Sequence, residues 1–143
     1  MFGIICAIIS GIAMSVQGVF NTRLGEKIGV WETTLLVQII ALIVSLVVFF
    51  FQGSGGYSHL KEANKLYLLG GVLGVVITFT VMKSVSSMGP TLGIGIILIS
   101  QLLAAAIIDA FGLFGSEKIR FLPNHFLGIA IMIAGIVIFK WNH

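Results

Sequence analysis

Three polar side chains share one face of the first apolar stretch of the chain. Ser10, Gln17 and Asn21, with Met14 among them, are spaced by four, three and four residues, so they align on one side of a helix. An amide in hydrocarbon is costly unless a partner or water satisfies it. The face therefore predicts either the polar wall of a substrate cavity, which we favour, or hydrogen bonds that hold helices together.

Two ionisable residues lie inside other apolar stretches. Asp109 shares the fourth stretch with Gln101, and it could bind a cation, exchange a proton or form a structural hydrogen bond or ion pair. Lys83 lies past the middle of the third stretch and either reaches the interface or pairs with an acid. Because these two helices run in opposite directions, Asp109 of an inverted second copy would lie at the depth of Lys83.

The elements that position these residues are membrane helices. The composition is 58% hydrophobic and only 9% charged, whereas soluble domains carry about 25% charged residues. A helix needs about 20 residues to cross a bilayer, and open strands would leave backbone groups unsatisfied in lipid. We therefore predict an all-α integral membrane protein with a single transmembrane domain over residues 1–143. The expected spans are approximately 2–20, 31–51, 66–88, 91–114 and 126–140.

The cations are divided equally between the two sides of the membrane. Numbering the connections alternately gives four on each side: Lys61, Lys65, Lys118 and Arg120 on one, and Arg23, Lys27, Lys83 and Lys140 on the other. Orientation in a bilayer is set mainly by an excess of Lys and Arg in short cytoplasmic loops. Without that excess, the chain is expected to insert in both orientations and to pair as an antiparallel homodimer.

Small residues mark candidate helix contacts. Gly70 and Gly74 are spaced by four in the third stretch, and Gly128 and Gly135 by seven in the fifth. Small residues let helix backbones approach closely in lipid. Packing within one chain is one interpretation of each pair, and the fifth-helix pair is our candidate for contact between subunits.

The sequence lacks the residues that several functional classes of protein require. No nucleophile–base pair, phosphate-binding loop or pair of carboxylates is present, so an enzyme is not predicted. Cys6 is the only cysteine, no metal-ligand spacing occurs, and we predict no cofactor. The sequence has no basic patch interleaved with aromatic residues, so a nucleic-acid partner is not predicted. The expected partners are a second copy of the chain, membrane lipid and a small-molecule substrate.

Three segments carry a resemblance to a known family. They are QGVFNTRLG (17–25), GGVLG (70–74) and QLLAAAIIDAFGLFG (101–115). With these segments the chain resembles the YdcZ-like five-helix proteins of the drug/metabolite transporter superfamily, over nearly its whole length. The polar segment KSVSSMGPT (83–91) departs from the more apolar stretch expected there.

The last two stretches are also similar to those of small multidrug-resistance exporters. GIAIMIAG (128–135) is similar to the glycine-spaced dimerisation helix of those exporters, which are antiparallel dimers. They carry a central Glu in the first helix, whereas the first span here has no acid. Asp109 is not in an equivalent position, so proton-coupled export of cationic drugs is not implied.

These observations lead to a functional expectation. We expect a small-molecule transporter of the plasma (bacterial inner) membrane that works by alternating access as an antiparallel homodimer. Gln17, Asn21 and Gln101 would form its site, with Ser10 and Met14 beside them, and Asp109 would either support these residues or act in coupling. An amide and aromatic wall suits neutral, weakly polar or amphipathic solutes. The alternatives are a passive channel or lipid-handling protein, and a structural or accessory membrane protein.

Overall fold

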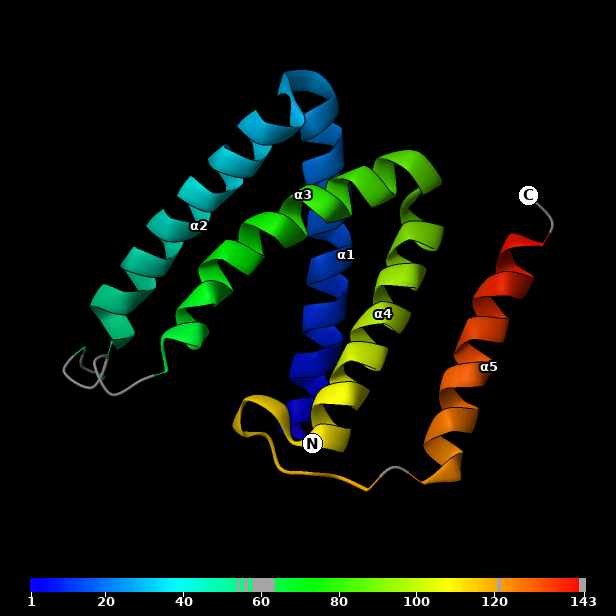
Figure 1. Ribbon diagram of the computed structural model, residues 1–143. Helices are drawn as coiled ribbons and strands as arrows, with labels where there is room; N and C mark the ends of the chain where they lie inside the picture. Colours follow the sequence, from blue (N-terminus) through cyan, green and yellow to red (C-terminus); the bar gives the residue numbers. More distant parts are fainter. Residues whose placement is uncertain (54, 56, 58–63, 121, 142–143) are drawn as a thin grey trace. The chain divides into compact units, whose positions relative to one another are not determined.

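The described part of the chain consists of five long α-helices and two short 3-10 turns. The computed structural model describes residues 1–53, 55, 57, 64–120 and 122–141. In chain order the elements are α1 (Phe2–Ile28), α2 (Val30–Gln52), η2 (Lys65–Leu69), α3 (Gly70–Met88), α4 (Pro90–Phe111), η3 (Leu113–Gly115) and α5 (Pro123–Lys140) (Figure 1). Each long helix, α3 together with η2, is long and apolar enough to cross a membrane. The prediction of an all-α membrane protein with five such helices is confirmed.

The helix ends differ from the expected spans in both directions. α1 continues beyond residue 20 through Asn21 and Thr22 to Ile28, and α5 begins at Pro123 rather than near 126. α4 ends at Phe111, because Gly112 adopts the left-handed conformation that closes many helices (φ 66°). The expected spans followed hydropathy, which falls at the first polar residues, whereas backbone hydrogen bonding continues through them.

Two pairs of successive helices are joined by a single glycine. Gly29 connects α1 to α2 with φ 101°, and Gly89 precedes α4 with φ 78°. Side chains disfavour these conformations, and a Cβ at Gly29 would also overlap the Glu32 carboxylate. At the second junction Pro90 follows in the first turn of α4, where its missing N–H costs no helical bond. Glycine is therefore required where one residue must redirect the chain.

The chain divides into two compact units, and the first contains α1, α2 and α3 (Met1–Ser86). A Cβ on Gly18 would lie only 3.1 Å from Val81 Cγ1, so α1 and α3 meet closely at this glycine. Met82 is 1% exposed. The Trp31 ring stacks on Phe79 with 4.6 Å between centroids, which ties α2 to α3. These contacts hold the three helices of the first unit together.

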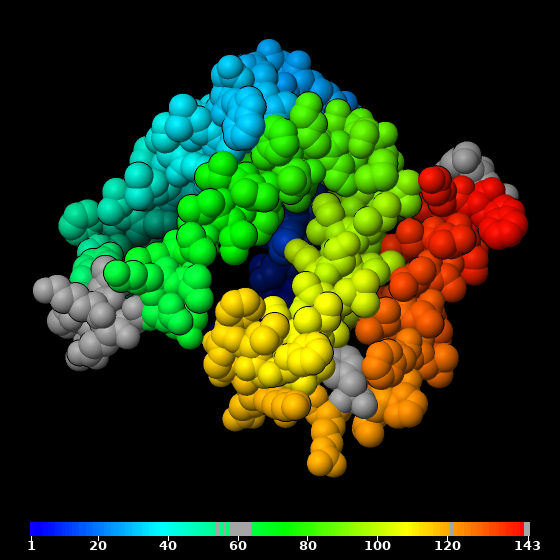
Figure 2. All heavy atoms as spheres, viewed as in Figure 1, coloured from blue at the N-terminus to red at the C-terminus, as the bar shows by residue number. Residues whose placement is uncertain are grey.

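The second unit contains α4 and α5 (Ser87–His143). A Cβ on Gly95 would lie 3.0 Å from Ile136 Cδ1, which shows where the two helices approach. Figure 2 shows the atoms of α4 (yellow-green) beside those of α5 (orange to red). The Ile119 N–H donates to the Asp109 carbonyl at 2.9 Å, so the segment after α4 folds back onto the end of that helix.

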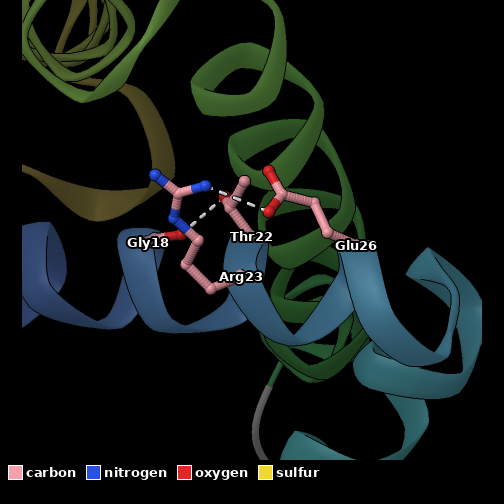
Figure 3. A network of polar contacts seen from close by, with 4 residues as sticks. All are labelled: Gly18, Thr22, Arg23 and Glu26. Atoms are coloured by element: carbon pink, nitrogen blue, oxygen red, sulfur yellow. Dashed lines mark hydrogen bonds and ion pairs between the residues drawn. The ribbon is translucent and has the colours of Figure 1, made fainter.

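Six hydroxyl groups within the helices bond to their own backbone. Thr22, Thr34, Thr78, Thr80, Ser15 and Ser100 each donate to the carbonyl four residues earlier, at 2.7–3.0 Å. Figure 3 shows the Thr22 bond to Gly18. Such bonds satisfy a hydroxyl without a second helix, as an apolar environment requires.

Thr33 differs from these residues and gives a testable prediction. Its side chain is fully buried, and Oγ1 has no hydrogen-bond partner among the described residues. We expect Thr33→Val to raise the free energy of unfolding by about 1 kcal/mol, because it removes an unsatisfied buried hydroxyl at nearly constant volume. Thr34→Val is the control, because the Thr34 hydroxyl is bonded to the Val30 carbonyl at 2.8 Å.

Both variants are compared with the unmodified protein by reversible denaturant unfolding in detergent micelles. The Thr34 variant should be no more stable than the unmodified protein. Equal losses of stability in both variants would show that the Thr33 hydroxyl is satisfied by water or by another copy.

Candidate functional site

The polar face of α1 is mostly open in the single chain. Ser10 and Gln17 are exposed, and Met14 is 47% exposed. Asn21, two turns before the end of α1, is buried with 8% of its surface exposed. The face therefore runs from exposed polar groups to an amide residue that is largely buried.

A small cavity of about 110 Å³ lies close to Asn21 in the first unit. Thr22 and Glu26 of α1, with Met82, Lys83 and Ser86 of α3, are among its lining residues. This volume exceeds that of a water molecule, and the lining offers polar partners for one. Lys83, which is exposed, lines this cavity together with Glu26, an acid of α1 that the sequence analysis did not consider.

The charges near this cavity are largely solvated. The Glu26 carboxylate forms an ion pair with Arg23 at 3.1 Å, three residues earlier on α1 (Figure 3). Both side chains are substantially exposed, at 47% and 74%, so the pair contributes little to stability. The two charges instead mark this end of α1 as polar, which suits an end of the helix outside hydrocarbon.

One amide in the first unit escaped the sequence analysis. Gln38 of α2 is half-buried, and a Cβ on Gly74 would lie 3.4 Å from its Nε2 atom. An amide inside an apolar stretch was the signal that singled out Gln17 and Gln101, and Gln38 carries the same signal. Gly74 thus provides space for a polar side chain from α2, while Gly70 has no neighbour within 4 Å of an added Cβ.

The second unit places Asp109 in a larger groove. Gln101 is exposed on α4, whereas Asp109 is half-buried and lines a groove of about 560 Å³ between α4 and α5. Asn124 and His125, from the first turn of α5, line the same groove. No role was expected for either, although the short connection between antiparallel helices brings the end of α4 near the start of α5.

The glycines of α5 remain uncovered within the chain. A Cβ on either Gly128 or Gly135 would meet no atom within 4 Å. α5 instead approaches α4 through Ile136, which touches the position of Gly95. Both glycines therefore leave room for another helix, and Gly128 also lines the groove between α4 and α5.

Comparison with known proteins assigns the chain to a family. The family model described as "Putative inner membrane exporter, YdcZ" matches residues 2–138. No curated protein and no solved structure matches the chain. The match covers four of the apolar helices and all but the last two residues of α5, and an exporter is a transporter rather than an enzyme. The chain therefore belongs to the YdcZ family of membrane transporters and is a multi-pass protein of the inner membrane.

Proposed function

We propose that this protein carries small molecules across the inner membrane by alternating access, as an antiparallel homodimer. The observation that carries the proposal is the equal number of cations at the two sets of helix ends. A chain with no excess on either side has no dominant orientation signal. Copies in both orientations would then coexist in one membrane, and each could pair with an inverted neighbour.

The exposure of the helices leaves room for an assembly larger than one chain. In the most apolar window of each helix, at most 11% of residues are buried, and in α5 none are. Membrane helices associate where small residues allow close approach, and Gly128 and Gly135 are open to such a partner. We assign them to the dimer interface.

The polar face of α1 suits the wall of the transport path. Ser10 and Gln17 are exposed on a helix that crosses the membrane, so they need water, substrate or a second copy as partner. An antiparallel dimer would present two such faces, with Gln101 of α4 adding a further amide. Because inversion makes the inward-open and outward-open states equivalent, neither state would be favoured energetically.

A counterflow assay in liposomes tests this function. Purified protein is screened with diverse radiolabelled solutes, and a carrier should show saturable uptake that unlabelled solute on the opposite side stimulates. We expect Gln17→Leu to reduce this exchange about tenfold, the effect of losing one or two hydrogen bonds to substrate. Val16→Leu, the adjacent exposed position, should leave exchange unchanged.

Two results would contradict the proposal. Rapid flux that never saturates would indicate a passive channel instead of a carrier. Unchanged exchange in a Gln17→Leu variant that inserts into the membrane as the unmodified protein does would show that the polar face of α1 does not line the transport path.

A further inference from the structure

The groove between α4 and α5 combines an apolar body with one polar end. Leu102 of α4 and Ile129 and Met132 of α5 are among its apolar walls, while Asp109 and Asn124 lie with His125 at its polar part. Its volume of about 560 Å³ falls within the range of roughly 300–1,000 Å³ that is typical of small-molecule sites. The groove lies within one compact unit, so it requires no second copy to form.

The Asp109 carboxylate lacks a compensating charge. It makes no hydrogen bond or ion pair with the other residues that the structure describes, although it is half-buried. Asp109 also lies in the last turn of α4 (Pro90–Phe111), where the free carbonyls make the local potential negative. A negative charge at a negative helix end, beside apolar walls, favours a cation as its neighbour.

Two backbone N–H groups at the start of α5 are already engaged in hydrogen bonds. Pro123 has no N–H group, and the His125 N–H donates to the Leu122 carbonyl at 3.0 Å. The Leu122 N–H in turn donates to His125 Nδ1 at 3.0 Å. These bonds use donors that could otherwise have stabilised a nearby anion. The imidazole is thereby engaged in closing the first turn of α5.

We propose that this groove binds a primary ammonium group carried on an apolar body. The ammonium would lie against the Asp109 carboxylate, the Asn124 amide oxygen could accept a second N–H, and the apolar body would occupy the groove. Asp109 is two residues from the end of α4, roughly 3 Å along the axis, which places it near headgroup depth. A free amphiphilic amine and the ethanolamine headgroup of a lipid both fit this chemistry.

The test measures binding directly and so does not depend on transport or on the dimer. The full chain in maltoside micelles, which contain no ammonium, is titrated calorimetrically with 4-phenylbutylamine and with the neutral 4-phenylbutanol. The amine should bind and the alcohol should bind at least about tenfold more weakly, as expected for loss of a charge-assisted contact. Short-chain phosphatidylethanolamine is then added as a competitor.

Matched variants isolate the carboxylate. Asp109→Asn should weaken amine binding about tenfold or more, whereas Asp109→Glu should retain it. Glu117→Gln makes the same change in net charge at an exposed residue outside the groove, and it should have no effect. Ala106→Leu, at another residue that lines the groove, should weaken binding without removing a charge. Gel filtration of each variant verifies that it is folded.

Each outcome decides the proposal. Competition by phosphatidylethanolamine would support the proposal and identify a lipid headgroup as the source of the ammonium group. Amine binding without such competition would support the proposal with a free amine as the ligand. Equal affinity of the unmodified protein and the Asp109→Asn variant would overturn it. Equal affinity for the amine and the alcohol, or no binding of either amine or lipid, would overturn it as well.

Discussion

The double substitution Ser116→Lys and Glu117→Lys should deprive the chain of its antiparallel partner. Both residues lie in the exposed connection between α4 and α5, and the change raises that side to six cations against four. An excess of Lys and Arg fixes orientation. If about nine in ten copies then insert the same way, oppositely oriented partners become roughly tenfold scarcer than the main population.

A complementary variant should restore the pair. Lys118→Ala with Arg120→Ala lowers the same side to two cations against four, so it should favour the opposite orientation. We expect each double variant alone to lose most dimer and exchange activity, and the two co-expressed to recover both. The dimer fraction is measured by native mass spectrometry, and exchange by the counterflow assay.

The control adds cations without creating a bias. Ser116→Lys combined with Ile28→Lys adds one cation to each side, because Ile28 ends α1 at the opposite set of helix ends. This variant should remain dimeric. Full dimer content and exchange in the biased variants expressed alone would show that pairing does not depend on opposite orientations.

Replacing Gly18 by leucine should destabilise the first unit strongly. Gly18 is buried, and an added Cβ would already lie 3.1 Å from Val81 Cγ1 before the rest of the side chain is built. Overpacking of this kind typically costs about 1–3 kcal/mol. We expect a loss of that size in the free energy of unfolding, measured by denaturant titration in micelles.

Gly11→Leu provides a matched control on the same helix. An added Cβ at Gly11 meets no atom within 4 Å, and leucine is the better helix former by roughly 0.8 kcal/mol. The control variant should therefore be as stable as the unmodified protein or slightly more stable. Equal stability of the two variants would mean that α1 and α3 do not pack at Gly18.

The sequence was sufficient for the class of fold because hydropathy and helix length are local properties. It also singled out Gly74 as a candidate helix contact, and in the structure an added Cβ there would lie 3.4 Å from Gln38 Nε2 of α2. The helix ends were harder to predict, since a helix that leaves the hydrocarbon continues through polar residues such as Arg23 and Glu26. Its actual end depended on a single glycine, Gly29.

The candidate sites show a similar limit. Inspection of single apolar stretches identified Asn21 and Asp109, because a polar group in hydrocarbon is conspicuous by itself. Gln38 carried the same signal and was overlooked. Asn124 and His125 gave no such signal, because their importance depends on the connection that returns α5 to the end of α4. Groups brought together by tertiary contacts cannot be identified from one helix alone.

The central claim, that both orientations coexist, is tested most directly by labelling one residue from one side. In a Cys6→Ala background, Ser116→Cys and Ile28→Cys each carry a single exposed thiol at opposite helix ends. A membrane-impermeant maleimide added to intact cells should label about half of either variant, and the rest only after the membrane is opened. Complete labelling of one variant with none of the other would show a single orientation and contradict the claim.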